Sequence, residues 1–201
     1  MNIQEYKTRF NNYYNNIHNA WSECDDEKLM TMPNGNEAKA IKDAVGKWYE
    51  KYRKELLEEI GFEVSEQEKF YGWNADQVLR VDGKIVAIES DKAQITTGLW
   101  SMIMDFIIIV DEMISEDKEN EIPYFILSSP TNVKKWESLM GKVNRMFNSS
   151  IVYNFNKKFV YLPSTNKGRI KRNEYIIKSE NPFELVDENI KKELEFLNKI
   201  K

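Results

Sequence analysis

The chain has 201 residues, of which 41% are hydrophobic and 31% charged, so it is long enough to bury the core of one globular domain. One cysteine and one histidine exclude a disulfide framework and argue against a zinc site or a Cys/His nucleophile. The net charge of −4, taken alone, argues against nucleic acid. No signal-peptide pattern opens the chain and no apolar run is long enough to span a bilayer, so we expect a soluble cytoplasmic protein with no membrane contact.

Two helices are expected at the start. Apolar side chains recur every three or four residues over 3–24, which predicts an amphipathic helix. A second helix is predicted over about Glu37–Ile60, with Gly61 as its C-cap.

Glu37 has two interpretations. Asn34 with Glu37 three residues later resembles a capping box, which is a structural role. Glu37 also projects on the same side as Ile41 and Val45, so it could instead deliver a carboxylate to a cleft. The pattern leaves both open.

Residues 74–92 read as a β-hairpin closed by Asp82-Gly83, a dipeptide that tolerates the positive φ angles of a type I′ turn. If Val81 faces Lys84, a regular register places Asp76 directly opposite Glu89, where two like charges repel each other. Asp91 would share the face of Glu89, because strand side chains alternate. Three carboxylates at one strand end predict a Mg²⁺ site formed by Asp76, Glu89 and Asp91.

The remaining elements follow from their apolar patterns. Ahead of the hairpin we expect a short strand over 62–64 and an approach segment over 69–71. After it we expect helices over 97–114, 133–147 and 184–200, a buried strand over 123–129, short strands over 151–155 and 159–162, and a basic loop over 163–173. This order predicts a single α/β domain (1–36, N-terminal helix and loop; 37–162, core; 163–201, basic loop and last helix) whose mixed central sheet has helices on both faces.

These residues and this order resemble the PD-(D/E)XK nuclease superfamily, the restriction-endonuclease-like fold. Its signature is an acid on one strand of a hairpin, an acid-x-Lys on the next strand, then a helix and a buried strand. Asp76 and Glu89 match the two acids, over a resemblance that covers about residues 37–162. The third position is Asp91 where the commonest pattern has Lys, and Lys92 comes one residue late. Some restriction enzymes carry an acid or amide there.

The resemblance implies a Mg²⁺-dependent endonuclease, with Mn²⁺ as a substitute, that hydrolyses double-stranded DNA as a homodimer. A type II restriction enzyme is the expectation. Asp91 would hold a second metal or act as general base, and Lys92 would reach the phosphate only through a bulge. The rivals are a repair or recombination nuclease, an RNase, and a non-catalytic binding or assembly protein.

The expected DNA surface is the basic stretch from Lys134 to Lys178, although the same stretch reads equally as a solvated lysine-rich face. The candidate contacts have hydrogen-bond donors suited to phosphates or base edges. They are Ser128, Ser129, Thr131, Asn132, Lys134, Lys135, Lys167, Arg169, Lys171, Arg172 and Asn173.

Overall fold

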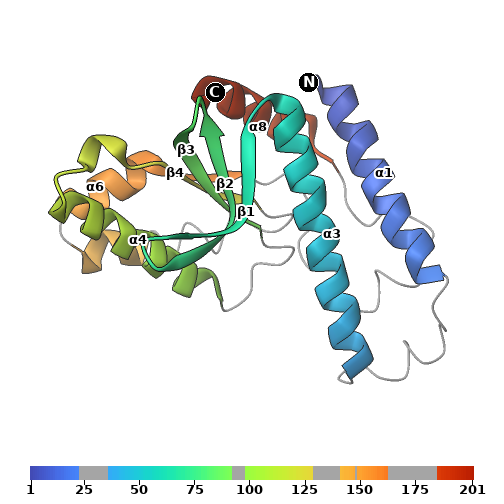
Figure 1. Cartoon of the computed structure of the whole chain (residues 1–201), viewed down its shortest axis with the longest axis horizontal. Coiled ribbons are helices and arrows are strands. Elements are labelled where there is room, and N and C mark those ends of the chain that lie inside the picture. Colours follow the sequence, from blue (N-terminus) through green and yellow to red (C-terminus); the bar gives the residue numbers. More distant parts are fainter. Residues whose placement is uncertain (23–35, 92–97, 129–140, 148, 163–184) are drawn as a thin grey trace.

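The computed structural model describes residues 1–22, 36–91, 98–128, 141–147, 149–162 and 185–201. Within these residues a mixed β-sheet stands between two groups of helices (Figure 1). The α/β layout with helices on both faces of the sheet is therefore confirmed.

The sheet has five strands in the order β1-β2-β3-β4-β5. The first three form an antiparallel meander, and β4 and β5 then run parallel to β3. Their bounds are β1 Glu63–Phe70, β2 Trp73–Val81, β3 Lys84–Asp91, β4 Tyr124–Ser128 and β5 Phe159–Leu162. The carboxyl ends of β3, β4 and β5 consequently share one edge of the sheet with the start of β2.

The helices are α1 Ile3–Ser22, α3 Asn36–Ile60, α4 Gly98–Ser115, α6 Ser149–Lys158 and α8 Asp187–Ile200, with a 3-10 turn at Glu119–Glu121. All of them except α6 agree closely with predicted helices. Gly61 ends α3 as expected: its φ is +111°, and the Phe62 amide donates to the Leu57 carbonyl at 3.1 Å. Of the helix predicted over 133–147, only 141–147 is described, and residues 141–146 are helical.

Two predicted strands are wrong in detail. Residues 151–155 belong to helix α6, because Ile151, Val152 and Phe155 form one helical stripe that packs into the core. Tertiary packing there overrides the β-propensity of the Ile-Val-Tyr sequence. The two short segments predicted over 62–71 are instead one continuous edge strand, β1, whose many charged side chains hid any alternation.

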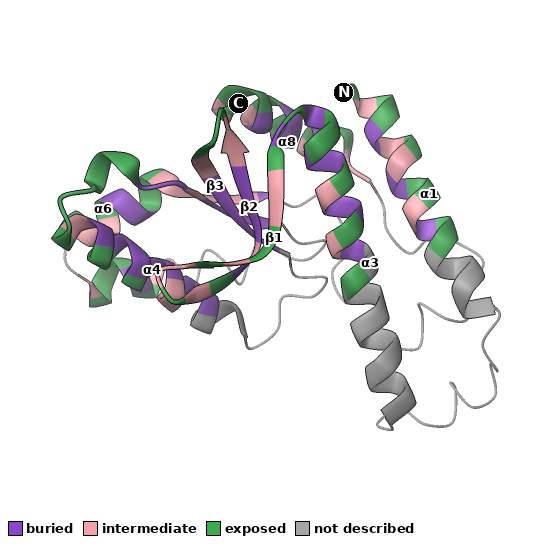
Figure 2. Ribbon diagram, in the orientation of Figure 1, coloured by how far each residue is buried: buried purple, intermediate pink, exposed green. Residues whose placement is uncertain are grey.

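Each face of the sheet has its own apolar core (Figure 2). We call the face covered by α4 and α6 the α4 face; its core includes Val78, Ile88 and Phe106. We call the face covered by α1, α3 and α8 the α3 face; its core includes Leu79 and Ala87. Val78 and Leu79 of β2, and Ala87 and Ile88 of β3, thus point to opposite cores, as the alternation of a strand requires.

Candidate functional site

The β2–β3 hairpin closes as predicted but its register does not stay regular. Asp82 and Gly83 both have positive φ, +49° and +74°, and Val81 faces Lys84. Arg80 then faces Ile85, whereas Leu79 faces Ala87, so Val86 is one extra residue in β3. This is a β-bulge, which shifts every later pair by one residue.

The bulge is consistent with the packing around it. Val86 and Ala87 both contribute to the α3 face, while Ile85 and Ile88 both contribute to the α4 face. All four of these apolar residues of β3 are thereby accommodated in the two cores.

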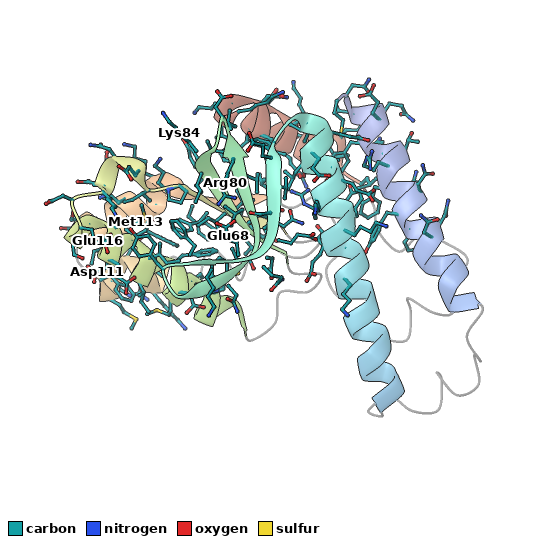
Figure 3. The ribbon with its side chains drawn as sticks, viewed as in Figure 1. Glu68, Arg80, Lys84, Asp111, Met113 and Glu116 are labelled. Atoms are coloured by element: carbon teal, nitrogen blue, oxygen red, sulfur yellow. The ribbon has the colours of Figure 1, made fainter. Side chains whose placement is uncertain are left out.

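Next to the hairpin, Arg80 of β2 and Glu68 of β1 point toward one another and form an ion pair (Figure 3).

The predicted pairing of Asp76 with Glu89 is wrong, because of this shift. Glu89 faces Gln77, and these two residues lie on the α3 face. Asp76 points to the α4 face, where the Ser90 hydroxyl donates to Asp76 Oδ2 at 2.9 Å. The two acids that the sequence placed side by side therefore occupy opposite faces of the sheet.

Glu89 is part of a buried ionic network that joins four elements. Arg53 of α3 directs Nε and Nη2 to Glu89 Oε1, at 2.8 and 2.7 Å. Arg53 Nη1 donates to Glu193 Oε1 of α8 at 2.5 Å, and the Tyr6 hydroxyl of α1 donates to Glu193 Oε2 at 3.0 Å. The three charged side chains are 1%, 0% and 1% exposed for Arg53, Glu89 and Glu193.

The sequence contains a signal for this network that lies outside the acidic motif. Arg53 lies on the stripe of α3 that contains Tyr49, Leu57 and Ile60, four or seven residues away. Glu193 lies on the stripe of α8 formed by Ile190, Leu194 and Leu197. A charged residue at a core-facing position of an otherwise apolar helix stripe indicates a buried partner, since an unpaired buried charge is costly.

The environment of the network shifts the pKa values of its members. Burial alone would lower the pKa of Arg53, but Glu89 and Glu193 together raise it well above its usual value. Burial raises the pKa of Glu193, against the opposing effect of Arg53. One guanidinium and two carboxyl groups thus share this buried network.

Gln77 completes the polar lining of the α3 face. Its side chain is fully buried, and Nε2 donates to the Glu50 carbonyl of α3 at 2.8 Å. Among the described residues, neither Gln77 Oε1 nor Glu89 Oε2 has a hydrogen-bond donor. In the part of the chain that the structure describes, Arg53 Nη2 likewise has no hydrogen-bond acceptor, although it lies in the ion pair with Glu89 Oε1.

The other predicted catalytic residues are only partly described. Asp91 is the last residue of β3 and pairs with Ser128, the last residue of β4, but the side chains of both lie outside the described residues. Glu37 lies in the first turn of α3, and its side chain is likewise outside them. Lys92 falls in the undescribed range 92–97. Within the described part of the chain, no three His, Cys, Asp or Glu side chains gather closely enough to hold a metal.

Most of the predicted DNA contacts fall in the undescribed ranges 129–140 and 163–184. These are Ser129, Thr131, Asn132, Lys134, Lys135, Lys167, Arg169, Lys171, Arg172 and Asn173. The basic surface consequently stays a prediction.

Comparison with known proteins finds no family model, no curated protein and no solved structure that matches this chain. None of the described helices is long and apolar enough to cross a membrane. The resemblance to PD-(D/E)XK nucleases therefore rests on the sequence pattern quoted above.

Proposed function

We propose that this chain is a Mg²⁺-dependent endonuclease that hydrolyses DNA phosphodiester bonds, in the manner of a type II restriction enzyme. The observation that carries the proposal is the edge of the sheet at which β2 begins and the parallel strands end. Glu89 lies near this edge, and β3 ends there at Asp91. Ligands of α/β sheets commonly bind at the carboxyl ends of the parallel strands.

The order of elements also favours the proposal. A hairpin, a helix and a buried parallel strand follow one another here as β2–β3, α4 and β4. This is the order that the PD-(D/E)XK resemblance implies.

The register restricts which acids can act together. Asp76 and Glu89 point to opposite faces, so we assign the metal to the α3 face, on which Glu89 lies. Glu89 suits a metal because its Oε2 has no donor among the described residues. A bound divalent ion would supply an activated water and would neutralise charge on the phosphate. Asp91, two residues further along β3, is the group we assign to accept a proton from the attacking water.

The proposal is tested by incubating the purified chain with plasmid or phage DNA, with Mg²⁺ or with a chelator. Discrete fragments are expected with Mg²⁺, and intact DNA with the chelator. Glu89→Gln retains an oxygen for Arg53 but loses the charge, and we expect cleavage to fall by about a hundredfold or more. Asp111→Asn is the matched control, because Asp111 is exposed on α4 (Figure 3). Cleavage by Glu89→Gln at the wild-type rate would contradict the assignment of Glu89.

A non-catalytic binding or assembly protein is the second candidate. The complete burial of Glu89 in an ion pair with Arg53 favours it, because a carboxylate held in this way can be purely structural. DNA that stays intact with Mg²⁺ and with Mn²⁺ would support this candidate over the nuclease. The predicted homodimer stays a prediction under either function.

A further inference from the structure

Helices α1 and α3 lie side by side (Figure 1), and a groove of about 620 Å³ lies between them, which is within the size range of ligand-binding clefts. Tyr13 of α1 stacks on Tyr52 of α3 in this groove, at a centroid distance of 4.9 Å. Arg9 of α1 crosses to α3, where Nη1 pairs with Glu55 at 3.3 Å and Nη2 pairs with Glu59. All of the lining residues belong to α1 or α3, so the groove is separate from the acidic motif of β2 and β3.

One wall of the groove is a row of uncharged polar side chains on α1, which we call the polar row. Its members are exposed and four residues apart: Gln4, Thr8, Asn12 and Asn16. Residues at this spacing follow one another along one face of a helix, and each of these side chains both donates and accepts hydrogen bonds. Because asparagine is a weaker helix former than alanine, helix stability does not account for Asn12 and Asn16.

The spacing of the polar row matches that of an extended polypeptide. Its members recur about every 6 Å along the helix axis, and the row is about 18 Å long. An extended chain advances about 3.3 Å per residue, and the N–H and C=O groups of every second residue point to the same side, about 6.6 Å apart. An extended segment of about five residues therefore covers the row and presents donors and acceptors to it at nearly the same interval.

The opposite wall of the groove, on α3, is charged. Lys51, Glu55 and Glu59 also stand four residues apart, and the Glu55 and Glu59 side chains remain 48% and 49% exposed although both pair with Arg9. With Glu5 of α1 included, carboxylates outnumber cations in the lining by three to two. This balance favours basic side chains in a ligand and disfavours the phosphates of a nucleic acid.

We propose that the groove between α1 and α3 binds an extended, basic polypeptide segment of a partner protein. The polar row holds the backbone of the segment, and the carboxylates of α3 attract its cationic side chains. Backbone hydrogen bonds supply affinity in this kind of recognition, and the side chains supply specificity. The proposal is independent of the nuclease function, because the groove shares no residue with the acidic motif.

The test is a nuclear magnetic resonance titration of the full, isotopically labelled chain with a blocked pentapeptide of alternating valine and lysine. The peptide should shift the side-chain amide signals of Asn12 and Asn16. The signal of Asn15, which is exposed on α1 but does not line the groove, should stay unchanged. The same peptide with methylated backbone nitrogens loses its donors and should bind about tenfold more weakly. A peptide with glutamate in place of lysine should also bind more weakly, because it meets the carboxylates of α3.

The double variant Asn12→Ala/Asn16→Ala separates recognition from folding. It should melt no lower than the wild type, because alanine favours the helix, but it should bind the lysine peptide about tenfold more weakly. Asn15→Ala is the matched control: it makes the same exchange on the same helix and should bind as the wild type does. Equal peptide affinity in the double variant and the control would overturn the assignment of the polar row.

Three further results would contradict a partner polypeptide as the occupant. The first is a wild type whose signals do not respond to the lysine peptide. The second is an oligothymidine strand that shifts the same side-chain amides as strongly, which would indicate a nucleic acid. The third is a double variant with a lower apparent mass than the wild type in size-exclusion chromatography, which would indicate that a second copy of this chain fills the groove.

Discussion

The two faces of the sheet differ in the side chains that they bury. The α4 face is closed by apolar packing, with Phe106 of α4 stacked on Phe125 of β4 at a centroid distance of 4.7 Å. The α3 face buries a comparable set of apolar residues but adds the network of Arg53, Glu89 and Glu193. Buried charges contribute little net stability compared with apolar residues of the same size. Among the described residues, buried charged side chains are found on this face and not on the α4 face.

The largest expected effect on stability comes from removing Arg53. Arg53→Met leaves two buried carboxylates without a counter-charge, and we expect the free energy of unfolding to fall by about 3–5 kcal/mol at neutral pH. Phe106→Ala, the comparison on the α4 face, should cost a similar 3–5 kcal/mol or so through the cavity it creates.

The pH dependence separates the two variants. Arg53 opposes the effect of burial on the pKa of Glu193, so without Arg53 that folded pKa rises further, and the variant recovers stability as pH falls and Glu193 takes up a proton. The cost of Phe106→Ala should stay constant over the same pH range. Urea denaturation at a series of pH values measures both, and equal pH profiles would show that the α3 face is no more ionic than the α4 face.

A smaller change in stability is expected from Glu193→Gln on the α3 face. Burial raises the pKa of Glu193 above the ordinary 4.5, so the stability contributed by its protonated form is fully present below the unfolded value and is lost as pH rises through the folded one. Glutamine mimics the protonated acid and can still accept from Arg53. We expect the variant to be more stable at neutral pH, by about 1.4 kcal/mol for each unit of the pKa difference.

Thermal melting of Glu193→Gln and wild type across the acidic range provides the measurement. The two should converge below the unfolded pKa and diverge toward neutrality. A variant less stable than wild type at neutral pH would mean that Glu193 is ionised and needed as the partner of Arg53.

The smallest expected effect lies on the α4 face at Asp76. Ser90→Ala removes the hydroxyl that donates to Asp76 Oδ2, and should cost about 0.5–1.5 kcal/mol. It should leave Mn²⁺ affinity unchanged, because Asp76 does not share the face of Glu89. Ser115→Ala, which removes an exposed hydrogen bond at the end of α4, is the control for losing a serine hydroxyl. Reduced Mn²⁺ affinity in Ser90→Ala would indicate that Asp76 is part of the metal site.

Sequence periodicity predicted most elements because each apolar stripe has one core to face. It could not predict the bulge, since Ile85, Val86, Ala87 and Ile88 are all apolar and the hairpin buries both of its faces. Either register places apolar side chains in both cores, and the choice depends on packing by helices far away in the chain. For the same reason the sequence identified Glu89 as a candidate site residue but did not identify its neighbours Gln77 and Arg53.

The register of β2 against β3 is the claim on which the account depends, and inter-strand nuclear Overhauser contacts of the hairpin backbone test it directly. The bulged register predicts contacts of Glu89 with Gln77 and of Ala87 with Leu79, and none that place Glu89 opposite Asp76. A regular hairpin would instead pair Glu89 with Asp76 and Val86 with Leu79. Contacts of that second kind would put both acids on one face and contradict the separation of Asp76 from Glu89.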